Sequence, residues 1–124
     1  MKEVRDLLLR ARNNWEILRE FRSGKDFGKE DLKGAIVELR DCLLRMSVLI
    51  LPPLLTKGFK PEQLEWVLNA AFRLRERFDT FLLLLEGVSD KSIIRAGLAI
   101  VLSEAPPIEP LLTFLEQITK DIDG

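Results

Sequence analysis

The sequence predicts an all-α fold, an antiparallel helical bundle of four main helices plus a short C-terminal fifth helix. Three observations support this prediction. Apolar residues recur at alternating spacings of three and four, the pattern of helices packed along a common seam. Leucine dominates the hydrophobic residues, and the β-branched and aromatic runs typical of strands are missing. Glycine and proline separate the periodic segments where helices would end.

Length and charge set the outer limits of the interpretation. The chain has 124 residues and a mass of 14.2 kDa, which indicates a single helical-bundle domain covering residues 1–124. Nineteen basic and twenty acidic side chains give a net charge of −1, which argues against a general polyanion-binding protein. Residues 1–25 carry seven basic and four acidic side chains, whereas residues 104–124 carry five acidic and one basic. This asymmetry either steers a partner, or pairs two subunits head to tail, or reflects two ordinary solvated faces.

The first helix is predicted over residues 2–22. Arg5, Arg12 and Arg19 recur every seven residues beside its apolar stripe. The stems of such arginines can cover apolar surface while their charged heads stay in water. The stripe contains Val4, Leu8, Ala11, Trp15 and Leu18.

The second helix is predicted to begin near Lys29 and to end at Pro52 and Pro53. A proline ring blocks a helical hydrogen bond and biases the preceding residue away from the helix. One further turn is predicted over residues 54–57, with Gly58 as its stop. The stripe of the second helix contains Leu32, Ile36, Leu39, Leu43, Met46 and Ile50.

The longest helix is predicted over residues 61–86, and the other segments are expected to cover it. Pro61 suits the first helical position, where no amide donor is needed, and Gly87 suits the residue just past the end. The stripe of this central helix contains Leu64, Val67, Ala71, Leu74, Phe78, Phe81 and Leu85.

Two more helices complete the predicted bundle. Ser89 is a suitable N-cap for a fourth helix over residues 90–104, which is apolar nearly all round after its first turn. Such a helix is central in the bundle or covered by a second subunit. The last helix is predicted to begin at about Glu109 and to bury Leu111, Phe114 or Leu115, Ile118 and Ile122.

The absence of histidine removes much of the catalytic repertoire. It excludes Ser-His and Cys-His nucleophile pairs, a histidine general base and the usual zinc and di-iron sites. The sequence also lacks a glycine-rich phosphate loop, a Walker motif and paired cysteines. Cys42 lies beside the stripe of the second helix and is predicted to be a core or boundary residue. We therefore expect no enzymatic activity, no catalytic residue, no metal and no cofactor.

Two pairs of acidic residues on the central helix are a candidate metal site. The spacing of Glu62 and Glu65, followed by Glu76 and Asp79, resembles the paired acidic motifs of MazG-type and dUTPase-like nucleotide pyrophosphatases. Those enzymes hold magnesium between two helices. Here all four residues fall on one predicted helix, and Glu65 and Glu76 would be roughly 16 Å apart along its axis. This distance predicts a solvated face rather than a shared ion.

Arginines suggest an alternative function as a helical subunit of a nucleoprotein complex. The candidate residues would form a strip that contacts nucleic-acid phosphates. Acidic residues between them and a sequence pI of about 5.6 weigh against this alternative. The phosphate-contact candidates are Arg5, Arg12, Arg19, Arg73 and Arg77.

The favoured function is a protein–protein interaction or scaffold module. Leu82, Leu83, Leu84 and Leu85 point in four successive directions, so a single stripe cannot bury them all. Either the bundle wraps around them, or an apolar patch is closed by self-association or by another helical protein. We expect a homodimer. The interface candidates are Trp66, Leu82, Leu83, Leu84, Ile100 and Val101.

The sequence also suggests a cytoplasmic location. The single cysteine rules out an internal disulfide framework and fits a reducing compartment. Charged residues crowd the start of the chain and no long uncharged run follows, so no signal peptide is predicted. The longest nearly apolar stretch, residues 46–55, is shorter than the ~20 residues that a membrane span needs.

Overall fold

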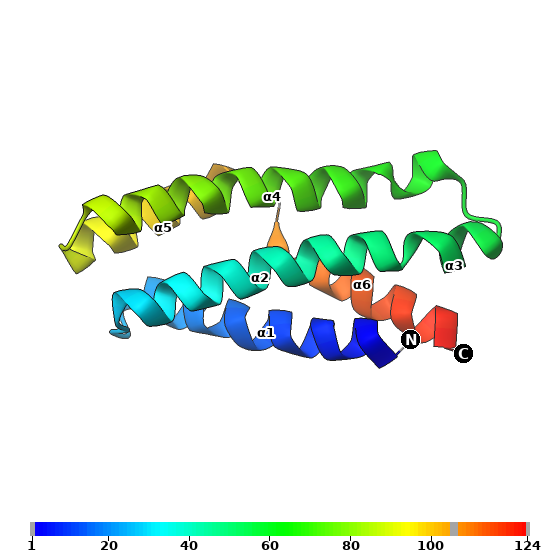
Figure 1. Cartoon of the computed structure of the whole chain (residues 1–124), viewed down its shortest axis with the longest axis horizontal. Coiled ribbons are helices and arrows are strands. Elements are labelled where there is room, and N and C mark those ends of the chain that lie inside the picture. Colours follow the sequence, from blue (N-terminus) through cyan, green and yellow to red (C-terminus); the bar gives the residue numbers. More distant parts are fainter. Residues whose placement is uncertain (1, 105–106, 124) are drawn as a thin grey trace.

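The chain is all-α. The computed structural model describes residues 2–104 and 107–123, apart from the side chains of Gln63 and Asp123. Within these ranges the chain forms helices and no strand (Figure 1). The helices are α1 (Lys2–Arg22), α2 (Lys29–Leu49), α3 (Leu51–Thr56), α4 (Pro61–Gly87), α5 (Lys91–Glu104) and α6 (Ile108–Asp123). The predicted fold class is confirmed.

The helices form four columns. α1, α2 and α4 follow one another in alternating directions, and α3 prolongs the α2 column (Figure 1). α5 turns back along α4, and α6 continues in the same general direction after a bend of 57°. α6 packs against α1 and thereby closes the bundle. The predicted antiparallel bundle is therefore observed. Its last column consists of the 14-residue α5 followed by the 16-residue α6.

Two glycines end helices through the same backbone motif. Gly24 follows α1 with φ of 118°, and Gly58 follows α3 with φ of 94°. In both turns an amide reaches back five residues to a helical carbonyl, from Lys25 to Glu20 and from Phe59 to Leu54. This is the Schellman arrangement, which needs a residue in the left-handed region just past the helix and so favours glycine.

The two prolines after α2 begin a helix as well as interrupt one. The break itself was predicted, since α2 ends at Leu49. However, Pro52 and Pro53 lie in the first turn of α3 rather than before it. Amides in a first turn have no partner within the helix, so the missing proline N–H groups cost nothing there.

The N-cap of α5 is Asp90 and not the predicted Ser89. The Asp90 carboxylate accepts hydrogen bonds from the amides of Ser92 (2.8 Å) and Ile93 (3.4 Å). Asp90 caps a helix as well as serine does and also places a negative charge near the positive end of the helix dipole.

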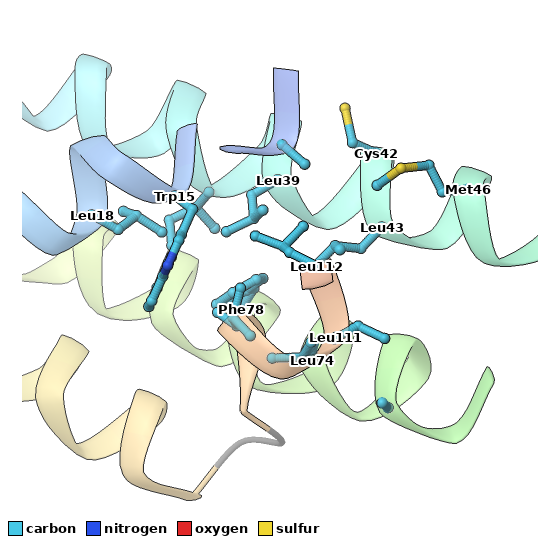
Figure 2. Packing of buried hydrophobic residues seen from close by; sticks show 14 of the residues in the cluster. Trp15, Leu18, Leu39, Cys42, Leu43, Met46, Leu74, Phe78, Leu111 and Leu112 are labelled. Atoms are coloured by element: carbon cyan, nitrogen blue, oxygen red, sulfur yellow. The ribbon is translucent and has the colours of Figure 1, made fainter. Parts of the chain in front are cut away.

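The predicted stripes form one core. Every residue of the stripes assigned to the first three long helices is buried. Phe78 and Phe81 of these stripes, and Phe21 of α1 beside them, are among the largest fully buried side chains. Figure 2 shows residues from α1, α2, α4 and α6 gathered around Phe78. In α6, Leu115 is buried and Phe114 is half-buried, which resolves the alternative between them. The bundle is thus held by the periodic apolar residues that the sequence displays.

Among the described residues, no single helix has both the length and the apolar composition to cross a membrane. The bent pair formed by α5 and α6 meets both criteria only when its two helices are taken together. Ile94, Leu98, Leu111 and Leu115 of this pair are buried against the bundle.

Candidate interaction surface

The basic side of α1 is paired with the acidic side of α6 within one chain. The guanidinium of Arg12 donates to the carboxylate of Glu116 at 2.6 Å and lies 3.8 Å from that of Glu109. Arg19 lies 3.6 Å from Glu109, and the indole nitrogen of Trp15 donates to the same carboxylate at 2.7 Å. Arg5 lines a shallow depression beside Arg12 and Glu116. The charge asymmetry between the two ends of the sequence therefore contributes to intramolecular packing.

The candidate phosphate-binding arginines do not form one strip. α1 packs against α2, α5 and α6, whereas α4 packs against α2 and α5, so Arg12 and Arg73 lie on separate columns. Arg77 of α4 forms an ion pair with Glu104 of α5 at 2.8 Å. Arg73 is exposed and has no carboxylate partner among the described residues. Carboxylates of the same chain pair with Arg12, Arg19 and Arg77, which weighs against the alternative in which these arginines contact phosphates.

The acidic residues of α4 do not converge either. Glu62, Glu65 and Glu76 are exposed, and Asp79 accepts a hydrogen bond from Arg40 of α2 at 2.6 Å. Among the described residues, no three His, Cys, Asp or Glu side chains are grouped so that they could hold a metal ion. Asp79 thus links α2 to α4.

Cys42 is a core residue. Its side chain is 2% exposed, and desolvation raises the pKa of its thiol. A thiol in such surroundings is protonated at neutral pH and is a poor nucleophile.

The four consecutive leucines of α4 separate as their spacing predicts. Leu85 is buried in the core. Leu82 lines a depression between α4 and the start of α2, together with Lys29 and Lys33. Leu84 points to α5, and Leu83 is 70% exposed. Consequently, only part of this apolar run is covered within the chain.

Gly97 lets α5 approach α4 closely. A Cβ atom at this position would lie 2.2 Å from the Cδ2 atom of Leu84, so even alanine would displace the leucine tip. Together with the Arg77–Glu104 ion pair, this contact sets the register of the two antiparallel helices. Ile93 and Ile100 lie one turn before and one turn after Gly97, and therefore on the α4 side of α5.

The outward surface of α5 is uncharged. Ile93 and Ile100 are 53% and 59% exposed, although both are large aliphatic residues. The positions of α5 that point farthest from the bundle carry only small side chains, and all of them are exposed. They are Ser92, Ala96, Ala99 and Ser103. We call this surface the α5 face; it consists of Ser92, Ile93, Ala96, Ala99, Ile100 and Ser103.

The cations of α5 are turned toward the α1–α2 connection, which keeps them off the α5 face. Lys91 donates to the Asp26 carboxylate at 3.0 Å and to the carbonyl of Phe27. The Arg95 guanidinium donates to the carbonyl of Phe21 at 2.7 Å and lies 4.6 Å from the centre of the Phe21 ring. These contacts connect the start of α5 to the end of α1.

Val101 and Trp66, like Leu82 and Leu84, are partly or wholly covered within the chain. Val101 is 9% exposed and belongs to the core, so its assignment to an interface was wrong. Trp66 is 45% exposed, and its ring contacts that of Phe114 edge-on, with centroids 4.7 Å apart. This contact ties α4 to α6.

The sequence reasoning did not identify Ile93, Ala96 and Ala99 as surface residues. α5 is apolar on nearly every side, so its periodicity does not distinguish the face that packs from the face that stays open. The nearest signal was Gly97, which marks where another helix comes close. Comparison with protein-family models, with curated proteins and with solved structures found no match for this chain.

Proposed function

We propose that this chain is a small non-enzymatic protein–protein interaction or scaffold module that self-associates by covering the α5 face with another helix. The observation that carries the proposal is the uncharged outward surface of α5, on which Ile93 and Ile100 are more than half exposed. An apolar helix face of this kind gains free energy when a second helix removes it from water. We place the module in the cytoplasm, where a single thiol such as Cys42 stays reduced.

The ion pairs of the arginines favour this function over nucleic-acid binding. Arg12, Arg19 and Arg77 are already paired with carboxylates of the same chain. Binding to phosphates would have to displace these carboxylates, whereas a helix docking on the α5 face displaces only water. An assembly held by apolar contacts keeps its mass as salt is raised, whereas phosphate contacts weaken steeply.

Sedimentation velocity at several protein concentrations and at two salt concentrations tests the proposal. The wild-type protein is expected to form dimers whose mass does not change with salt. Ile100→Asp is expected to raise the dissociation constant on the order of 100-fold, because dimerisation would bury an unpaired carboxylate. Ile100 is 59% exposed, so the change leaves the core intact.

The matched control is Leu9→Asp. Leu9 is 62% exposed on α1, beside Arg5 and Arg12, and outside the α5 face. This variant is expected to dimerise like the wild type, and circular dichroism should give the same helix content for both variants. A wild-type protein that stays monomeric at all concentrations would contradict the proposal, as would an Ile100→Asp variant that dimerises normally.

A further inference from the structure

We infer that the helix covering the α5 face is α5 of a second copy of this chain, packed antiparallel about a two-fold axis. This inference rests on the proposed function and specifies its partner and geometry. In a two-fold dimer the same surface serves both copies, so the face must be complementary to itself when it is reversed.

The four small residues of the α5 face read the same in both directions, whereas Ile93 and Ile100 lie beside them and are not exchanged by this reversal. The four are Ser92, Ala96, Ala99 and Ser103, spaced by four, three and four positions. Reversal about the midpoint between residues 97 and 98 places serine opposite serine and alanine opposite alanine. Small side chains at all these positions allow the two helix axes to come to the short end of the usual 8–10 Å range.

The exposed isoleucines distinguish the antiparallel arrangement from the parallel one. Ile93 and Ile100 both lie on the α4 side of α5, on either side of Gly97. A two-fold axis perpendicular to the helices keeps the α4 sides of both copies on one side of the interface. The four isoleucines then cover one another beside Leu84 of each copy. A parallel pair would instead place them on opposite sides, where they would stay exposed.

The helix dipole of α5 agrees with this direction. α5 begins at Lys91 and ends at Glu104, and its interior after Arg95 is uncharged. Both end side chains keep accessible surface, 33% and 53%, despite their intramolecular ion pairs. Asp90 and Asp26 lie at the same end as Lys91, and Arg77 is paired with Glu104, so each end of α5 carries charges of both signs. Antiparallel packing opposes the two helix dipoles favourably. Parallel packing would align the two helix dipoles, which disfavours that arrangement.

Cysteine cross-linking tests the geometry. Ser92→Cys and Ser103→Cys are conservative changes at exposed positions, and the wild-type protein with only the buried Cys42 is the control. The two variants carry tags of different length, so that mixed dimers are recognised on a denaturing gel. Each variant is treated alone, and then both are treated after subunit exchange, with a short bismaleimide.

The antiparallel dimer is expected to give a cross-link only in the mixture. Identical positions would be separated by roughly 16 Å along the helix axes, beyond the reach of the reagent, whereas residues 92 and 103 would face each other. Cross-linking of each variant with itself would indicate a parallel pair and overturn the inference. A wild-type dimer by sedimentation with no cross-link in any mixture would also overturn it while leaving self-association intact. A monomer by sedimentation would instead overturn the proposed function itself.

Discussion

The two sides of the α5–α6 column differ in how they meet the rest of the molecule. On the α1–α6 side, Arg12 and Arg19 pair with Glu109 and Glu116. These ion pairs bridge helices from opposite ends of the sequence. On the side formed by α4 and α5, the Arg77–Glu104 ion pair lies at the end of an apolar surface whose isoleucines remain more than half exposed.

This difference shows that charge and apolar surface have separate uses in this bundle. Exposed ion pairs contribute little free energy, but they select which helices lie side by side. Apolar surface contributes far more when it is buried, and the exposed part of it is available for association. The surface of the α1–α6 side is therefore occupied mainly by ion pairs, although Leu9 stays exposed beside them, whereas the α5 face combines two exposed isoleucines with small uncharged residues.

The largest expected effect comes from removing a buried apolar side chain of α6. Leu112 of α6 is fully buried beside Phe78 (Figure 2). Leu112→Ala should lower the free energy of unfolding by about 2–5 kcal/mol, because it removes buried carbon atoms and leaves a cavity. Urea denaturation followed by circular dichroism measures this change.

Leu83→Ala is the matched comparison for this measurement, because Leu83 is 70% exposed on α4. The same chemical deletion there should change the free energy of unfolding by no more than about 0.5 kcal/mol. Equal losses for the two variants would contradict the burial of Leu112 and the exposure of Leu83.

A smaller effect is expected from the ion pairs of α1 with α6. Arg12→Gln removes the charge that lies near Glu116 and Glu109, and should cost about 0.2–1 kcal/mol at low salt. The loss should shrink as salt is raised, because these side chains are about one-third to one-half exposed and are therefore screened. Thermal melts at low salt and at about 1 M salt measure both quantities.

Arg73→Gln provides the control, since Arg73 has no ion pair among the described residues. Its melting temperature should follow that of the wild type at both salt concentrations. If the loss of stability in Arg12→Gln stays constant in high salt, this arginine acts through packing of its stem and not through its charge.

The smallest effect is expected for the Glu38 carboxylate, which joins α2 to α1. A hydrogen bond from Arg10, with a second from Asn14, lowers the pKa of Glu38 from its usual value. A carboxyl group with a lowered pKa stabilises the fold above its unfolded pKa of about 4.3. That contribution is lost as the pH falls through the lower pKa of the folded state.

Glu38→Gln should therefore melt slightly below the wild type at pH 7, and the two melting temperatures should converge as the pH falls below about 4. Glu65→Gln, at an exposed position of α4, serves as the reference for a carboxylate without an ion pair among the described residues. A difference in melting temperature between Glu38→Gln and the wild type that persists to the lowest pH would show that the ionised Glu38 carboxylate is not its cause.

Much of the fold could be predicted, because its signals are local. The inward stripes of the first three long helices follow from spacings of three and four, which place residues on one face whatever the neighbours are. The first residue of α4, Pro61, and the break after Leu49 also follow from proline geometry. The helix caps were less predictable, since Ser89 and Asp90 are both good caps and only the path of the chain selects between them.

The sequence by itself therefore determined that this chain is helical and which side of each long helix faces inward. Only the tertiary structure decided which charges meet, because Arg12 and Glu116 are 104 positions apart and nothing local links them. It likewise decided which side of α5 stays open. An almost uniformly apolar helix gives no periodic signal, and its buried side is selected by contact with Leu84 and the core.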